Sequence, residues 1–174
     1  MESRTIDESL QFLKRIDEIR VLAERAFRLL KNKNLSIAVA ESITAGGFVH
    51  YLTSVPGSSS VVTGGIVAYT IPVKVAFLDV GEMTIQKFGV VSKEVAIEMA
   101  NGIRDKFMSG IGMGVTGYAG PSGGDEFAPV GRVYWGIVGP GGQKSLQLSL
   151  EGDREGIRLE SIKRGMQFLI ENLL

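Results

Sequence analysis

The 174-residue chain contains no cysteine and a single histidine. The lack of cysteine excludes disulfides, thiolate nucleophiles and zinc–thiolate sites. His50 alone makes a histidine-based metal site or a Ser-His-Asp triad hard to build, and its place within a predicted helix favours a structural or surface role. We therefore expect a protein that works without a metal and without another cofactor.

An excess of one charge and a long apolar run are also missing. The 19 basic residues balance 19 acidic ones, and no long basic run occurs, so binding to nucleic acid is disfavoured. No stretch of about 18 apolar residues suggests a membrane span. Residues 1–4 show no pattern of a secretory signal. These absences predict a cytoplasmic protein without a membrane partner.

Apolar residues make up 44% of the chain, enough for a sizeable core. Their spacing alternates between the period of a helix and that of a strand. We expect helices at 6–33, 44–54, 72–79, 84–88, 93–107 and 155–174, and strands at 35–40, 61–69, 111–116, 132–138 and 144–150. This order predicts an α/β three-layer sandwich, with a mixed sheet, helices on both faces and an extra N-terminal helix.

One domain is expected over residues 1–174, made of an N-terminal helical segment at 1–33 and an α/β core at 34–174. The long helix at 6–33 has two readings. It packs on the core, or its N-terminal half forms a contact between copies of the chain.

Two glycine patterns resemble nucleotide-binding motifs, but neither has the right context. Residues 112–117 match G-x-G-x-x-G, yet these glycines lie within or at the end of a predicted strand, and no helix follows. Residues 139–145 faintly resemble a phosphate loop, but they join two strands as a hairpin. A dinucleotide fold of the usual kind is therefore not expected.

Serines, a tyrosine and a lysine gather between Glu41 and Lys74. A serine hydroxyl is a weak nucleophile unless a base takes its proton, and without cysteine or a well-placed histidine the remaining base is lysine. Burial among apolar neighbours would have to lower the pKa of Lys74 from about 10.4 to about 7–8. Tyr69 could orient the lysine or relay its proton. The alternative is a set of surface loops beside a lysine whose stem lies along apolar surface.

Two further segments could bind an anion. The glycine-rich loop at 116–124 can present backbone N–H groups to an anion or a carbonyl, although a tight turn has a similar composition. Gly46 and its neighbour permit close approach of a ligand or a strand. Arg154 could reach a phosphate, or it could pair with Asp153.

Seven short motifs follow one another along the chain. They are Ala40-Glu-Ser-Ile-Thr-Ala-Gly46, Pro56-Gly-Ser-Ser-Ser60, Gly65-Ile-Val-Ala-Tyr69 with Lys74, Gly89-Val-Val-Ser92, Thr116-Gly-Tyr-Ala-Gly-Pro121 with Gly123-Gly124, Pro129-Val-Gly131 and Gly152-Asp-Arg154. With these motifs in this order, the chain resembles over residues 20–174 the CinA C-terminal domain family, the nicotinamide-nucleotide amidases.

The resemblance implies hydrolysis of the carboxamide of nicotinamide mononucleotide to nicotinate mononucleotide and ammonia. It implies Ser59 as nucleophile, Lys74 as base and Tyr69 in support, with Ser42 as the rival nucleophile. The small-molecule nucleotide would be bound by residues of the strand-end loops: Thr44, Gly46, Ser58, Thr116, Gly117, Gly120 and Arg154. A homo-oligomer is expected.

The chain departs from the family pattern in three places. Ile43 replaces the frequent cysteine after Glu-Ser, Ile71-Pro72 replaces Asn-Glu between the tyrosine and the lysine, and Arg132 replaces a small or neutral residue. The Ile71-Pro72 change removes two polar side chains close to the proposed base. Two alternatives to the amidase therefore stay open: a non-catalytic nucleotide-binding or regulatory module, and a scaffold that acts by self-association.

Overall fold

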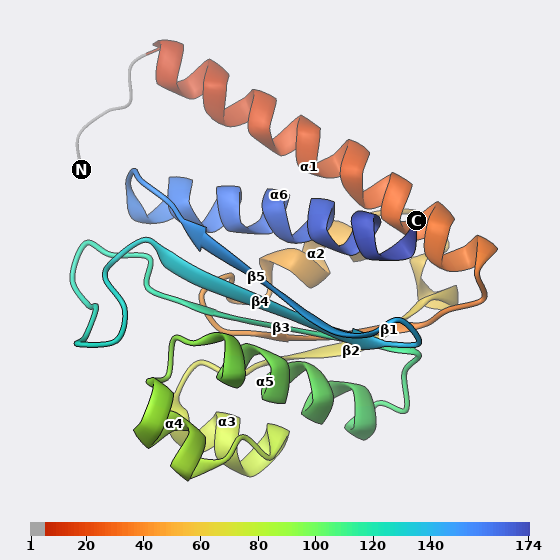
Figure 1. Cartoon of the computed structure of the whole chain (residues 1–174). Coiled ribbons are helices and arrows are strands. Elements are labelled where there is room, and N and C mark those ends of the chain that lie inside the picture. The colour runs from red at the N-terminus through yellow and green to blue at the C-terminus, as the bar shows by residue number, and fades with distance from the viewer. Residues whose placement is uncertain (1–5) are drawn as a thin grey trace.

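A five-stranded sheet forms the middle layer of the molecule (Figure 1). The computed structural model describes residues 6–174, with side chains from residue 9 onward, so the signal prediction at residues 1–4 lies outside the described part. The strand order is β2-β1-β3-β4-β5. The strands are β1 (Ile37–Glu41), β2 (Val62–Val67), β3 (Ile111–Gly117), β4 (Arg132–Gly139) and β5 (Gly142–Ser149).

Strand direction decides which loops meet. Strand β1 lies between β2 and β3 and runs parallel to both, whereas β3–β4 and β4–β5 are antiparallel. Glu41, the last residue of β1, lies opposite Val67 of β2 and Val115 of β3. The carboxyl ends of these three strands therefore share one edge of the sheet, where α/β proteins commonly bind ligands.

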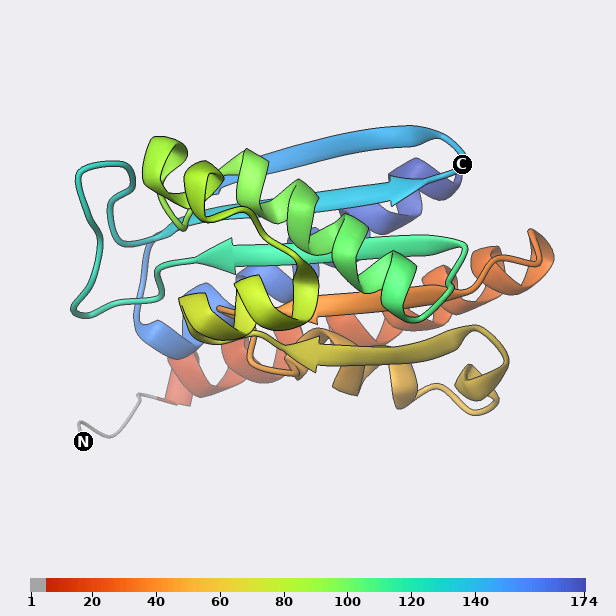
Figure 2. The ribbon, with the colours of Figure 1, turned by 90° about the horizontal axis from the view of Figure 1, so that it is seen from below.

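Helices cover both faces of the sheet (Figures 1 and 2). Helices α1, α2 and α6 lie on one face, and α3, α4 and α5 lie on the other. Their bounds are α1 (Ile6–Asn32), α2 (Gly47–Thr53), α3 (Ile71–Leu78), α4 (Glu82–Phe88), α5 (Lys93–Lys106) and α6 (Arg154–Leu173), with a short 3₁₀ turn at Ser58–Ser60. The predicted three-layer α/β class with a mixed sheet is confirmed.

The core on the α1/α6 face is centred on Trp135, which is fully buried in β4. Its ring lies 4.8 Å from that of Phe48, centroid to centroid, and its indole N–H donates to the carbonyl and the hydroxyl of Ser161. A Cβ at Gly165 would stand 2.4 Å from the same ring. Close packing against the indole thus fixes α6 on the sheet.

Local signals in the sequence set most helix boundaries. Pro72 lies in the first turn of α3, where its missing N–H costs nothing. The Ser92 hydroxyl accepts from the amide of Val95 and caps α5. The helix predicted to begin at Thr44 begins three residues later, at Gly47, because residues 42–46 form a turn instead.

None of the helices between residues 6 and 174 combines the length and the apolar character that a bilayer crossing requires.

Candidate active site

A pocket of about 240 Å³ lies at the edge where β1, β2 and β3 end. The residues that line it come from the ends of these strands and the segments that follow them, from the loop before α5 and from the start of α6. They are Ser42, Ile43, Tyr69, Ile71, Lys74, Val90, Val91, Thr116, Gly117, Tyr118, Ala119, Ser122 and Arg154. The fold thus brings residues from five separate parts of the chain to one pocket.

Lys74 is the buried cation of this pocket. Its side chain is only 1% exposed, and its Nζ donates to the Oγ of Ser42 at 2.9 Å and to the carbonyl of Ala68 at 2.7 Å. Helix α3 follows β2 directly, so its first turns carry the lysine back across the ends of β2 and β1. The predicted burial of Lys74 is confirmed.

Burial lowers the pKa of Lys74 from its ordinary 10.5 to about 8, because the apolar surroundings disfavour the charged ammonium. Both groups that accept its hydrogen bonds, a hydroxyl and a carbonyl, are neutral. Near pH 8 a substantial fraction of the lysine is therefore the free amine, whose lone pair can take a proton from Ser42.

Ser42 stands on a turn that the Glu41 carboxylate holds in place. One oxygen of Glu41 accepts from the amides of Gly46 and Phe48, and the other accepts from the amide of Val49 at 2.8 Å. These are amides at the start of α2, which lack partners within the helix. A carboxylate there is further favoured by the helix dipole. Glu41 therefore fixes the path of the backbone on both sides of Ser42.

The turn after Ser42 offers unused donors. The amide of Ser42 donates to the carbonyl of Val115, but the amides of Ile43 and Thr44 donate to no acceptor within the described residues. The Thr44 hydroxyl is also fully buried and without a hydrogen-bond partner. Two backbone N–H groups thus follow the nucleophile candidate directly.

Arg154 closes the outer side of the pocket. Its guanidinium donates to the carbonyl of Gly120 at 2.7 Å and to the hydroxyl of Tyr69 at 2.8 Å. It therefore ties the start of α6 to the glycine-rich loop and to the segment after β2. A guanidinium has five N–H donors, so it can also bind an anion without giving up these contacts.

Thr116 and Tyr118 form the wall on the β3 side. The Thr116 hydroxyl donates to the carbonyl of Val90, and the Tyr118 hydroxyl donates to the Asp125 carboxylate at 2.8 Å. Partial burial, followed by that hydrogen bond, raises the pKa of Tyr118 to about 12. Tyr118 therefore stays a neutral donor that holds the glycine-rich loop.

Ser59 is not part of this pocket. It is exposed and lies in the 3₁₀ turn before β2, whereas Lys74 follows the opposite end of that strand. Six residues of β2 at about 3.3 Å each separate the two ends by about 20 Å. The predicted pairing of Ser59 with Lys74 is corrected to Ser42 with Lys74.

Of the other predicted binding residues, some lie at the pocket and one lies far from it. Thr116, Gly117 and Arg154 line the pocket, and Gly120 adjoins it through Arg154. Ser58 lies in the distant turn, where its hydroxyl donates to the carbonyl of Thr53.

Gly46 and Thr44 lie outside the pocket lining. The Gly46 amide binds Glu41, and the Thr44 carbonyl accepts from Arg158. The contacts of Glu41 with the start of α2 are not predicted from the sequence, although an acidic residue at a strand end with two glycines shortly after it is a usable signal. The apolar wall of Val90 and Val91 is not predicted from the sequence either.

No group of three His, Cys, Asp or Glu side chains suited to a metal ion occurs from residue 9 onward, where side chains are described.

Comparison with known proteins gives a consistent result. The family model described as CinA C-terminal domain matches residues 19–173. A CinA-like protein of Fervidobacterium nodosum is 43% identical over 135 residues, which are 78% of this chain and 33% of that protein. The crystal structure of competence/damage inducible protein CihA from Agrobacterium tumefaciens superposes with a TM-score of 0.85 at 34% identity, covering 89% of this chain and 95% of that one.

The competence or damage-inducible protein from Enterobacter asburiae also superposes, with a TM-score of 0.87 at 26% identity over 90% of this chain and 98% of that chain. The chain spans about a third of the length of the curated relatives that it matches. It thus corresponds to one part of those proteins.

Proposed function

Because the chain belongs to the CinA C-terminal domain family, we propose that it hydrolyses the carboxamide of nicotinamide mononucleotide by a Ser42–Lys74 mechanism. One observation carries this proposal: the 2.9 Å contact between Lys74 Nζ and Ser42 Oγ in a buried pocket. A serine with a neutral amine as its base is an established way to activate a hydroxyl for acyl transfer. The reaction would yield nicotinate mononucleotide and ammonia, in the cytoplasm.

The first half of the reaction forms an acyl-enzyme. Ser42 Oγ attacks the carboxamide carbon while the free amine of Lys74 accepts the hydroxyl proton. The negative charge on the carbonyl oxygen is stabilised by the amide of Ile43, a residue that lines the pocket, a contribution of about 3–4 kcal/mol. Lys74 then gives the proton to the leaving nitrogen, the C–N bond breaks, and ammonia departs.

The second half releases the acid. Water attacks the ester on Ser42, Lys74 accepts a proton from that water, and the C–O bond to Ser42 breaks. Lys74 returns the proton to Ser42 Oγ, which restores the starting state. The carbonyl of Ala68 keeps the amine aimed at Ser42 through both halves.

The pocket fits the reacting ring rather than the whole nucleotide. Its volume of about 240 Å³ is below the 300–1,000 Å³ range of sites that enclose an entire ligand. We place the pyridine ring against the apolar wall of Val90, Val91 and Ile71, and the phosphate outside, at Arg154. Tyr69 positions Arg154 rather than Lys74 in this arrangement, because its hydroxyl accepts from the guanidinium.

A binding module without turnover is the second candidate. Ile71 lines the pocket and Pro72 opens the helix that carries Lys74, at the positions where the family pattern has polar residues. The fold, Ser42 and Lys74 would then serve only to hold a nucleotide.

Ammonia release from nicotinamide mononucleotide separates the two functions. The amidase releases ammonia in proportion to enzyme, and brief acid quenching followed by peptide mass analysis finds the acyl group on the peptide that contains Ser42. Binding of the nucleotide in calorimetry, together with no ammonia over several hours, would contradict the amidase and support the module.

A further inference from the structure

Helix α1 carries apolar residues on two faces, and the described part of the chain covers only one of these faces. The covered face packs on α6 and the core through Phe12, Ile16, Ile19, Ala23, Ala26 and Leu30. The second face carries a row formed by Leu10, Leu13 and Val21, whose exposed fractions are 60%, 56% and 65%. At 100° per residue, Leu10 and Val21 lie within about 20° of one another and opposite the covered face.

This row borders a shallow groove of about 790 Å³ between α1 and α6. Besides the row itself, Lys14 and Asp17 of α1 and Lys163 of α6 line the groove. Single exposed apolar residues are normal, but here three of them line one groove, as apolar residues at a protein contact do. The groove therefore has the character of a docking surface.

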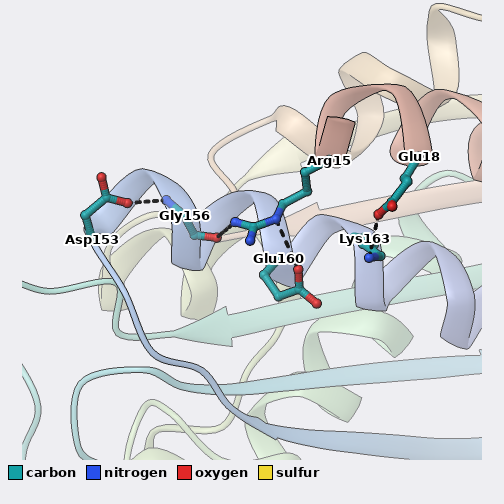
Figure 3. Close-up of polar contacts among 6 residues, drawn as sticks. All are labelled: Arg15, Glu18, Asp153, Gly156, Glu160 and Lys163. Atoms are coloured by element: carbon teal, nitrogen blue, oxygen red, sulfur yellow. Dashed lines mark hydrogen bonds and ion pairs between the residues drawn. The ribbon is translucent and has the colours of Figure 1, made fainter. Parts of the chain in front are cut away.

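Ion pairs between α1 and α6 fix the direction in which the row faces (Figure 3). Arg15 Nε lies 3.3 Å from Glu160, and Lys163 Nζ lies 2.6 Å from Glu18. The Glu18–Lys163 contact also lowers the pKa of Glu18 below its ordinary value. These pairs clamp α1 onto α6, so the row cannot turn inward without breaking them.

We propose that the row binds the same row of a second copy of this chain, with the two α1 helices antiparallel. The two-fold axis would pass between residues 15 and 16. In this register Leu10 packs on Val21 of the partner subunit, and Lys14 lies opposite Asp17 of the partner subunit. Two-fold symmetry forms each of these contacts twice.

The charges on the row favour a second copy over another partner. Lys14 and Asp17 stand at equal distances on either side of the proposed axis, so the row is complementary to itself when reversed. Asp17 is already 3.1 Å from Arg20 of its own helix, but such an exposed pair contributes little and leaves the carboxylate accessible. A parallel pair would instead oppose lysine to lysine and aspartate to aspartate.

The N-terminal half of the row is a feature of this chain rather than of the shared domain. The family match begins at residue 19, whereas Leu10, Leu13, Lys14 and Asp17 precede it. The proposed contact therefore concerns a part of α1 that lies ahead of the matched domain.

Light scattering of the full chain over a range of concentrations tests the contact. The wild-type chain is expected to be a dimer, and Leu13→Glu combined with Val21→Glu is expected to raise its dissociation constant at least about a hundredfold. Met108→Glu is the matched control, since Met108 is 91% exposed and lies far along the chain from α1. Circular dichroism verifies that each variant keeps its helices.

Charge exchange tests the register. Lys14→Glu and Asp17→Lys are each expected to weaken the dimer about tenfold, and the double variant is expected to restore it. In a parallel pair every one of these variants would keep like charges together, so none would weaken the dimer.

The absence of cysteine permits a cross-linking test of the orientation. A mixture of Lys14→Cys and Asp17→Cys chains is expected to form a disulfide heterodimer. Leu10→Cys chains alone are expected to form none, because the antiparallel register separates these positions by about 16 Å along the axis. A monomer at all concentrations, a dimer indifferent to the Leu13/Val21 variant, or ready cross-linking of Leu10→Cys would overturn the proposal.

Discussion

Two serine-bearing turns lie at opposite ends of the same sheet, and they differ in what surrounds them. Ser42, at the carboxyl end, is 8% exposed and within hydrogen-bond distance of a buried amine. Ser59, at the amino end of β2, is exposed, and its neighbour Ser60 merely donates to the carbonyl of Gly57 in its own turn. The comparison shows that a serine becomes a candidate nucleophile through its neighbours rather than through the motif around it.

The two turns are also held differently. The turn after β1 is fixed by three amides that donate to the buried Glu41 carboxylate, and it leaves the amides of Ile43 and Thr44 unused. In the Ser58–Ser60 turn, the amides of Ser58 and Ser60 donate to backbone carbonyls. The turn at the pocket is thus stabilised by a buried carboxylate, whereas the Ser58–Ser60 turn is stabilised by backbone hydrogen bonds within the turn.

Replacing each serine in turn gives the largest expected effect. Ser42→Ala is expected to lower ammonia release from nicotinamide mononucleotide by about 10⁴-fold or more, because Ser42 carries the only hydroxyl among the described residues that hydrogen-bonds to Lys74. Ser59→Ala is expected to stay within about twofold of wild type. Loss of activity in Ser59→Ala with full activity in Ser42→Ala would reverse the assignment.

Removing the amine is expected to have the next largest effect on the rate. Lys74→Met keeps most of the side-chain volume and is expected to lower kcat about 10³-fold, as for loss of a general base. The wild-type rate should rise with pH and reach half its maximum near pH 8, the pKa of Lys74. A flat profile between pH 6.5 and 9.5 would exclude the lysine as the base.

The same substitution has a measurable consequence for stability. Below pH 8 the folded chain holds a buried ammonium, which costs about 3 kcal/mol relative to the unfolded chain. Between pH 8 and 10.5 the unfolded chain binds more protons, so this cost is relieved as the pH rises. The difference in free energy of unfolding between Lys74→Met and wild type, from urea titrations, should therefore shrink between pH 7 and pH 10.

The stabilisation of the Ser42 turn by Glu41 is tested by Glu41→Gln. Glutamine offers one acceptor oxygen in place of two and puts an N–H₂ group against amides, so we expect a loss of about 2–4 kcal/mol in the free energy of unfolding. Ser60→Ala is the counterpart in the other turn, and it removes only an exposed hydroxyl, with an expected loss below about 0.5 kcal/mol. If the two variants lost the same free energy of unfolding, Glu41 would not stabilise its turn more than Ser60 stabilises the other.

The smallest effect concerns the outer side of the pocket. Tyr69→Phe and Arg154→Lys each break the 2.8 Å contact between the two side chains, and each is expected to raise KM up to about tenfold with little change in kcat. Because both variants remove the same contact, the double variant should be less than additive. Additive losses, or a fall in kcat alone for Tyr69→Phe, would instead place the tyrosine in the chemical step.

The order of elements followed from the sequence because local rules govern it. The periodicity of α1, Pro72 in the first turn of α3 and the Ser92 cap each depend on residues within a few positions. With no cysteine and a single histidine, lysine was the remaining candidate base. That inference depends on which residue types occur in the chain and not on where they lie in the fold. The motifs of the CinA C-terminal domain family could likewise be recognised in the sequence without the structure.

Only the tertiary structure decided which serine lies against Lys74. Ser59 is 15 residues from Lys74 and Ser42 is 32, yet the parallel pairing of β1 with β2 places the nearer serine at the far end of the sheet. The turn that follows β1 places the Glu41 carboxylate at the start of α2, and the packing of α6 on Trp135 brings Arg154 to Tyr69. Sequence composition determined which reactive groups the chain carries, and strand direction determined which of them lie together in the pocket, because contacts across a sheet depend on the relative direction of strands rather than on separation along the chain.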